Sequence, residues 1–130
     1  MKHGKIIEPA VGNVRDHERR TAKALASVGM TVEFVEPSDR DSTKSPDVLI
    51  DGVYWEVKSP RTDKMTQIEK NLKRASKQSP YIVIDSRRVK RISDTTLQKY
   101  LLGRLIAQKS IRRILFVNRR GEVVDIATLA

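Results

Sequence analysis

The sequence contains no cysteine and only two histidines, His3 and His17, among its 130 residues. A chain without cysteine has no disulfide framework, no iron–sulfur cluster and no thiol chemistry. Two histidines supply too few soft ligands for a structural zinc site. Long apolar runs are also missing, and no stretch approaches the length of a membrane span. These absences leave a folded domain whose chemistry must come from carboxylates, amides and cations.

The abundant residues are cationic, and they are unevenly distributed. The formal net charge is +10, and residues 60–113 hold 15 Lys and Arg against 4 Asp and Glu, whereas residues 1–59 hold 9 against 10. A basic region beside a smaller acidic one suits a metal-dependent enzyme that acts on a polyanion, although a basic surface without a partner is the alternative. The basic region contains only Tyr81 and Tyr100 as aromatics, which argues against a protein that binds single strands by base stacking.

The acidic region contains the most informative segment, a predicted hairpin over residues 46–58. Two apolar segments of strand type flank Asp51-Gly52, the strongest short-range signal for a two-residue hairpin turn. With this turn, the cross-strand pairs are Ile50 with Val53, Leu49 with Tyr54, Val48 with Trp55 and Asp47 with Glu56. Two carboxylates about 5 Å apart repel by roughly 3 kcal/mol at an effective dielectric of 20. A divalent cation between Asp47 and Glu56 turns this repulsion into a binding site.

The alternation of strand side chains places Lys58 on the same face as these two acids. Val48, Ile50, Trp55 and Val57 fall on the opposite face, which predicts that Trp55 belongs to the core. Asp51 points to the acidic face but lies in the turn, so we interpret it as structural. The alternative is a solvated surface on which Lys58 only offsets the two acids, and this leaves the opposition of Asp47 and Glu56 unexplained.

Periodicity predicts the other elements and an α/β fold. Helices are expected from Asn13 or Asp16 to Val28, from Lys64 to Lys77 and from Ser93 or Asp94 to Lys109, with strands over 31–35, 46–50, 53–58, 81–85, 111–118 and 122–126. The order is helix, three strands, helix, strand, helix, two strands. It predicts one domain over residues 1–130, a mixed sheet flanked by helices, with residues 1–12 as an irregular arm.

Apolar stripes give the expected helix faces towards the core. They comprise Thr21, Ala22, Leu25 and Val28 on the first helix, Met65, Ile68, Leu72 and Ala75 on the second, and Leu97, Tyr100, Leu101, Leu105 and Ile106 on the third. One turn before the first stripe lies Glu18. Its carboxylate is either a first-turn charge favoured by the helix dipole or a member of the active site.

Two further groups of polar residues are candidates for contact with nucleic acid. A polar stripe lies beside the second apolar stripe and consists of Gln67, Asn71, Arg74 and Gln78. It is either a solvated face or a set of groups, Gln67, Asn71 and Arg74 among them, that hold a phosphate or an attacking water. The loop 86–91 carries four cations in six residues, Arg87, Arg88, Lys90 and Arg91. This density favours phosphate contacts over a merely solvated loop.

The hairpin residues resemble the motif of the PD-(D/E)XK nucleases. Pro46-Asp47, eight residues and then Glu56-Val57-Lys58 match this pattern. From about residue 15 to 117 the chain is most similar to the C-terminal tRNA nuclease domains of contact-dependent growth inhibition (CdiA-type) toxins. The likeness rests on three segments: His17-Glu18-Arg19-Arg20-Thr21-Ala22, Ser45-Pro46-Asp47 and Tyr54-Trp55-Glu56-Val57-Lys58-Ser59-Pro60.

The resemblance implies a toxin that cleaves tRNA in the cytoplasm of a target bacterium and is neutralised by a cognate immunity protein. It also implies delivery as the C-terminal part of a secreted or cell-surface protein. Asp47 and Glu56 would bind magnesium or manganese, with zinc a further option, and the Val57 carbonyl would be a third ligand. Lys58 would position or deprotonate a metal-bound water. By analogy with related nucleases, Glu18 would be a further ligand or would orient one.

Two alternative functions remain open at the level of sequence. One is a DNA endonuclease of the same fold, such as a junction resolvase or repair enzyme, because phosphate contacts carry no information on the sugar. The other is a non-catalytic nucleic-acid-binding module that retains a relic of the site.

Overall fold

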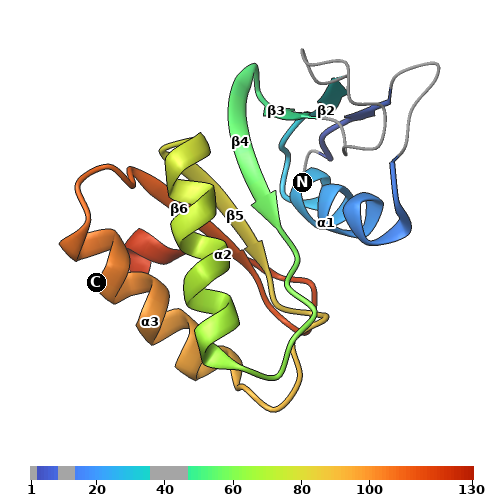
Figure 1. Cartoon of the computed structure of the whole chain (residues 1–130). Helices are drawn as coiled ribbons and strands as arrows, with labels where there is room; N and C mark the ends of the chain where they lie inside the picture. Colours follow the sequence, from blue (N-terminus) through green and yellow to red (C-terminus); the bar gives the residue numbers. More distant parts are fainter. Residues whose placement is uncertain (1–2, 9–13, 36–46) are drawn as a thin grey trace. The chain divides into compact units, whose positions relative to one another are not determined.

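The computed structural model describes residues 3–8, 14–35 and 47–130, except for the side chain of Asp47. The chain divides into two compact units, residues 1–55 and 56–130, and strand β4 begins in the first and ends in the second (Figure 1). Residues 36–46, which include Ser45 and Pro46 of the quoted motifs, lie outside the described residues. The predicted extent of a single domain stays a prediction.

The helices and strands follow the predicted order with two additions. Unit 1 contains β1 Ile6–Ile7, α1 Asp16–Ser27, β2 Val32–Val35, β3 Asp47–Ile50 and the start of β4 Val53–Lys58. Unit 2 contains the end of β4, α2 Met65–Gln78, β5 Tyr81–Asp85, α3 Asp94–Ala107, β6 Arg113–Val117, β7 Val123–Asp125 and the 3₁₀ helix η1 Ile126–Leu129. The α/β class is therefore confirmed. The expected irregular arm contains the short strand β1, and η1 follows the last strand.

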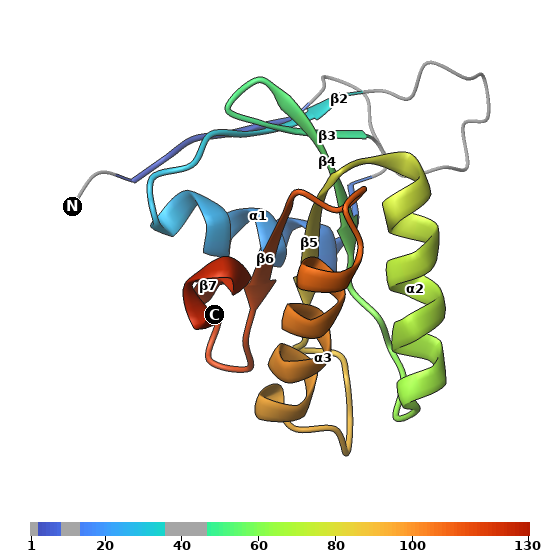
Figure 2. The same ribbon diagram turned by 90° about the vertical axis from the view of Figure 1, so that its left-hand side faces the viewer.

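Unit 1 has a mixed sheet with α1 against it (Figure 2). β1 runs parallel to β2, whereas β2, β3 and β4 are successively antiparallel. The register places Phe34 beside Val48 and Val48 beside Trp55, and these three side chains are buried. The predicted core position of Trp55 is thus confirmed, and one face of the sheet provides the apolar surface that α1 covers.

Helix α1 ends at Ser27, one residue before the predicted end at Val28. Thr21, Ala22 and Leu25 are buried, as predicted, and Gly29 adopts a φ of 95°, which a residue with a side chain rarely adopts. The prediction that Val28 faces the core is wrong, because its side chain is 48% exposed. Ser27 is the last helical residue and Val28 is the C-cap, so Val28 no longer follows the helical period.

Unit 2 has a mixed sheet with α2 and α3 on one face. β4, β5 and β6 are parallel, and β7 is antiparallel to β6. The main core consists of Ile82, Ile84, Ile114 and Phe116 from the sheet together with buried residues of both helices, among them Ile68, Leu72, Leu97 and Leu101. Paired residues of adjacent strands point to the same face, so this face of β5 and β6 is the one that the helices cover.

One predicted core residue of α3 lies at the surface instead. Leu97 and Leu101 are fully buried, and Tyr100 and Leu105 are packed against the core, but Ile106 is 70% exposed. Ile106 follows Leu97 by nine residues, a rotation of about 180° at 3.6 residues per turn. The prediction for Ile106 is therefore wrong because the side chain points away from the buried stripe.

Candidate active site

The turn between β3 and β4 has the conformation that its sequence predicts. Asp51 and Gly52 both have positive φ, 49° and 83°, as a two-residue type I′ turn requires. The Asp51 carboxylate accepts a hydrogen bond of 2.9 Å from the Thr31 N–H, and the Asp51 N–H donates to the Thr31 carbonyl at 2.9 Å. Asp51 thus ties the turn to the start of β2, which supports its interpretation as a structural residue.

The turn fixes the predicted register over three residue pairs. Ile50 pairs with Val53, Leu49 with Tyr54 and Val48 with Trp55. The residues that follow the Val48–Trp55 pair, away from the turn, are Asp47 on β3 and Glu56 on β4. The backbone of Asp47 pairs with Val35 of β2, and its side chain lies outside the described part of the structure. The opposition of the two carboxylates stays a prediction.

Glu56 and Lys58 lie two residues apart on β4, so the alternation of the strand places their side chains on one face. The ammonium nitrogen of Lys58 lies 3.6 Å from Oε1 of Glu56, and the two side chains are 30% and 18% exposed. In the parallel ladder Glu56 pairs with Ile82 and Lys58 with Ile84. These isoleucines belong to the face covered by α2 and α3, so Glu56 and Lys58 emerge on the same side of the unit 2 sheet as α2.

The polar stripe of α2 lies next to its buried stripe. Gln67 and Asn71 are partly buried, Arg74 is exposed, and Ile68 and Leu72 form the adjacent apolar stripe. Within the described residues, the side-chain amides of Gln67 and Asn71 have no hydrogen-bond partner in the protein. These amides retain their capacity to bind a phosphate oxygen or a water on the side of the sheet that bears Glu56 and Lys58.

The cations of loop 86–91 differ in the ion pairs and hydrogen bonds that they form within unit 2. The Arg87 guanidinium contacts the buried carboxylate of Asp85 from Nε at 3.1 Å and from Nη2 at 2.8 Å, and the Arg87 N–H donates to it at 3.0 Å. Arg91 lies 3.9 Å from Asp63 and is 85% exposed. In the part of the chain that the structure describes, Arg88 and Lys90 have no ion-pair partner. Arg87 therefore organises the loop, whereas Arg88 and Lys90 keep their charges available.

Glu18 has a structural contact that its position in the sequence allows. It lies in the first turn of α1, and its Oε1 accepts a hydrogen bond of 2.9 Å from the Arg15 N–H. A carboxylate at this place satisfies an otherwise free N–H group and interacts favourably with the helix dipole. This contact accounts for one of the two roles considered for Glu18; its participation in a catalytic site stays a prediction.

The turn Arg119-Arg120-Gly121 carries two arginines that were not among the cations predicted to contact phosphate. The turn is present between β6 and β7, with Gly121 at a φ of 78°. Its two arginines follow the carboxyl end of β6, and loop 86–91 follows the carboxyl end of the neighbouring parallel strand β5. Two adjacent arginines within a turn are the sequence signal from which this further pair of exposed cations could have been predicted.

The donors around β4 suit a hard cation. Carboxylate and carbonyl oxygens are the ligands that magnesium and manganese prefer, and Glu56 with the backbone of Val57 supplies such oxygens. No group of three or more Asp, Glu, His or Cys side chains placed to hold a metal occurs among the described residues, a set that does not include the Asp47 carboxylate. Metal binding is therefore an expectation that depends on Asp47.

Comparison with known proteins identifies the relatives of this chain. The family model for the contact-dependent growth inhibition CdiA C-terminal domain matches residues 44–123. The structure is similar to the CdiA-CT/CdiI toxin and immunity complex from Burkholderia pseudomallei, with a TM-score of 0.63, 17% sequence identity, and coverage of 94% of this chain and 98% of the other. No curated protein matches the chain. Over the described residues, no helix has the length and apolar character needed to cross a membrane.

Proposed function

Because the chain belongs to the contact-dependent growth inhibition CdiA C-terminal domain family, we propose that it is a metal-dependent endoribonuclease toxin that cleaves tRNA. The observation that carries this proposal is the Glu56–Lys58 pair, whose side chains lie 3.6 Å apart on one face of β4. The three pairs of the β3–β4 register agree with the predicted hairpin as far as Val48 and Trp55, and its predicted next pair, Asp47 with Glu56, is the one that we expect to act jointly.

The proposed metal site uses Asp47, Glu56 and the Val57 carbonyl as protein ligands. A bound magnesium or manganese ion supplies two effects: it lowers the pKa of a bound water and neutralises charge that develops on the scissile phosphate. Two close carboxylates repel each other when no cation lies between them. The predicted opposition of Asp47 and Glu56 is therefore better explained by metal binding than by hairpin stability.

Lys58 has the position expected of a group that orients or deprotonates the attacking water. Its ammonium is partly buried and lies near the Glu56 carboxylate, so its charge is held on the face where the ligand acids are proposed to act. A general base must reach the proton that it removes. Glu18 would assist as a further ligand or as an orienting group, in addition to its contact with the Arg15 N–H.

The substrate would be held by the amides of α2 and by the surrounding cations. Gln67 and Asn71 lie on the same side of the unit 2 sheet as Glu56 and Lys58, and Arg74 is exposed on the same helix. The excess of positive charge over residues 60–113 suits a polyanion but does not select RNA over DNA. The choice of tRNA rests on the resemblance of the sequence to the tRNA nuclease domains.

The family also supports a setting for this activity. We infer that the chain is delivered as the C-terminal part of a cell-surface toxin, acts in the cytoplasm of the target bacterium and is neutralised by a cognate immunity protein. The similar Burkholderia structure is itself a toxin and immunity complex. If this inference holds, production of the chain inside a bacterial host arrests growth, and Lys58→Ala abolishes the arrest.

A cleavage assay tests the activity directly. Purified protein is incubated with total tRNA or plasmid DNA, with magnesium, manganese, zinc or chelator, beside Asp47→Ala, Lys58→Ala and the control Lys99→Ala, whose side chain is exposed on α3. We expect tRNA cleavage that requires metal and is lost in the first two variants only. Cleavage that persists in chelator and in both variants contradicts the site, and cleavage of DNA alone contradicts the substrate. Binding without cleavage favours a non-catalytic module.

A further inference from the structure

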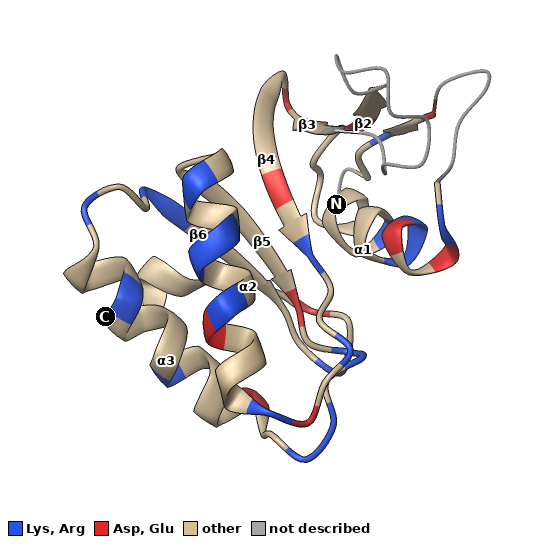
Figure 3. Cartoon of the chain, in the orientation of Figure 1, with Lys and Arg blue, Asp and Glu red and all other residues tan. Residues whose placement is uncertain are grey.

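Two cationic segments meet at the carboxyl ends of β5 and β6. Loop 86–91 follows β5 and turn 118–121 follows β6, and the parallel pairing brings these ends to the same edge of the sheet. We call their cations the basic platform; they are Arg87, Arg88, Lys90, Arg91, Arg119 and Arg120. Figure 3 shows this gathering of Lys and Arg at one edge of unit 2.

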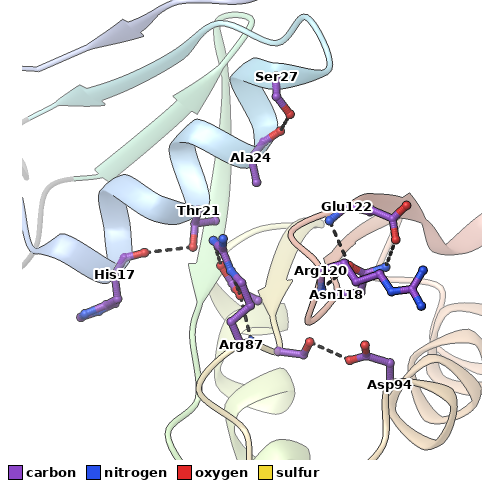
Figure 4. Close-up of polar contacts among 11 residues, drawn as sticks. His17, Thr21, Ala24, Ser27, Arg87, Asp94, Asn118, Arg120 and Glu122 are labelled. Carbon is purple, nitrogen blue, oxygen red and sulfur yellow. Dashed lines mark hydrogen bonds and ion pairs between the residues drawn. The ribbon is translucent and has the colours of Figure 1, made fainter.

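The two segments are fixed to each other by the first residue of α3. The Asp94 carboxylate accepts a hydrogen bond of 2.8 Å from the Ser86 hydroxyl (Figure 4). It accepts a second hydrogen bond, of 3.0 Å, from the Arg119 N–H. Ser86 is completely buried, and its N–H donates to the Val117 carbonyl at 2.9 Å. One carboxylate thus joins the start of the loop to the start of the turn, which preorganises the platform.

The turn itself is stabilised by Asn118. The Asn118 side-chain oxygen accepts hydrogen bonds from the N–H groups of Arg120 at 3.0 Å and Glu122 at 2.9 Å. A Cβ atom added to Gly121 would lie 3.5 Å from Nη1 of Arg87. The turn therefore packs against the guanidinium of Arg87, and the loop and the turn form one continuous surface.

The cations of the platform divide into bound and available groups. Arg87 is held by Asp85, and the Arg119 guanidinium donates to the Ile92 carbonyl at 2.7 Å. The side chains of Arg88 and Arg120 have no partner within the described residues. Arginine matches phosphate with a planar fork of donors and is poorly replaced by lysine in this role.

The platform lacks the apolar centre that protein interfaces usually have. Val89 is buried, and the exposed large apolar side chains of the described chain, Ile7, Val28, Val53, Ile106 and Leu129, all lie outside the two segments. A surface of arginines without exposed apolar residues suits a sugar–phosphate backbone better than a folded protein partner.

We propose that Arg88 and Arg120 bind phosphate groups of the nucleic-acid substrate, while Arg87 and Arg119 are positioning residues that fix the loop and the turn. This inference rests on the proposed nuclease function and adds Arg120 to the substrate-binding residues. It also separates Arg87 from direct phosphate contact.

Binding to a cleavage-deficient protein tests the proposal. In a Lys58→Ala background, labelled tRNA is titrated over a series of salt concentrations with Arg88→Ala/Arg120→Ala and with the control Lys109→Ala/Arg112→Ala. The control removes the same charge from exposed cations that precede β6, at the opposite end of that strand. We expect the platform variant to bind on the order of tenfold more weakly. The slope of the logarithm of the binding constant against the logarithm of the salt concentration should become shallower by about two. The control should change little beyond the effect of its lower net charge.

Several outcomes separate this proposal from the proposed function. Equal loss of affinity in both double variants overturns the platform. The proposed nuclease function is then still supported if the parent protein cleaves tRNA. Absence of cleavage by the parent, with selective loss of binding in the platform variant, overturns the nuclease and supports the platform. Equal competition by polyglutamate and tRNA at matched charge assigns the surface to acidic protein and overturns phosphate recognition. Unfolding midpoints confirm folding, and Arg88→Gln/Arg120→Gln, which retains side-chain volume, is expected to lose binding as well.

Discussion

Lys58 holds its ammonium nitrogen 3.6 Å from Oε1 of Glu56, two residues earlier on β4. Strand geometry requires that residues separated by two share a face, and the parallel ladder with β5 places this face on the side of α2. The pair combines an acid suited to metal binding with a cation suited to positioning a nucleophile. Replacement of Glu56 and replacement of Lys58 are therefore expected to remove different properties of the protein.

Glu56→Gln should remove metal binding while it preserves the fold. An amide is a weaker ligand than a carboxylate and carries no charge to offset a divalent cation. Manganese is expected to raise the unfolding midpoint of the parent protein by about 3 °C or more, and this increase should vanish in Glu56→Gln. Glu69→Gln, an exposed acid on α2, is the control and should retain the increase. Equal stabilisation of all three proteins would contradict the assignment of Glu56.

Lys58→Ala should lose cleavage but keep metal binding. General acid–base groups typically contribute a factor of about 10² to 10⁴ to the rate, so tRNA cleavage is expected to fall within this range. The manganese-induced rise of the unfolding midpoint should persist, because Lys58 is not a metal ligand. Loss of both properties together would indicate that Lys58 supports the fold or the metal rather than the reaction.

The Asp51-Gly52 turn should require glycine at position 52 because of the backbone conformation there and not because of crowding around a side chain. A Cβ at Gly52 would meet nothing within 4 Å, but the φ of 83° is costly for other residues. We expect Gly52→Ala to destabilise the protein by about 1 kcal/mol. Gly103, inside α3, also has open space around it, and Gly103→Ala should stabilise by roughly 0.5–1 kcal/mol. Urea unfolding measures both changes in stability. Because the turn sets the register, we also expect Gly52→Val to reduce metal-dependent cleavage more than other variants with the same loss of stability do.

Local rules predicted the hairpin and most of the core. Asp51-Gly52 specifies its own turn, and the turn sets the register from Val48 to Trp55. Ile106 was assigned wrongly because an apolar residue was counted without its helical angle, and Val28 because the helix ends one residue earlier than expected.

The arrangement of the basic segments could not be read from spacing. Asp94 joins Ser86 to Arg119, residues that are 33 positions apart in the sequence. Such a contact depends on the parallel pairing of β5 with β6, for which a single sequence holds no local pattern. Similarly, the cations of loop 86–91 looked equivalent in the sequence, whereas the structure holds Arg87 against Asp85.

The Asp85–Arg87 pair should contribute more to stability than the other ion pair of the same loop. Asp85 is 2% exposed, and Arg87 donates to it from Nε and Nη2. Because hydrogen bonds between charged groups are strong and Arg87 is only partly exposed, we expect Arg87→Ala to cost roughly 1–3 kcal/mol of unfolding free energy. Arg91→Ala, whose pair with Asp63 is 3.9 Å long and exposed, should cost less than about 1 kcal/mol. Chemical denaturation compares the two, and equal losses would show that the buried carboxylate does not depend on Arg87.

Tyr100 of α3 should ionise at unusually high pH because it is partly buried and lies near Glu69 of α2. Partial burial raises the pKa of its phenol above the usual 10.0, the Glu69 carboxylate raises this pKa further, and Arg104 opposes the shift. The folded state therefore retains the proton more strongly than the unfolded state does. This stabilisation is complete below about pH 10 and is lost as the pH rises through the folded pKa.

Comparison with Tyr100→Phe isolates this ionisation. Tyrosinate absorbance is titrated in both proteins, and the difference between the two curves should have its midpoint above pH 10. In urea unfolding at increasing alkaline pH, the parent protein should lose more stability than Tyr100→Phe, because the variant has no phenol to ionise at this position. A difference curve with its midpoint at or below pH 10 would contradict the packing of Tyr100 against the core and beside Glu69.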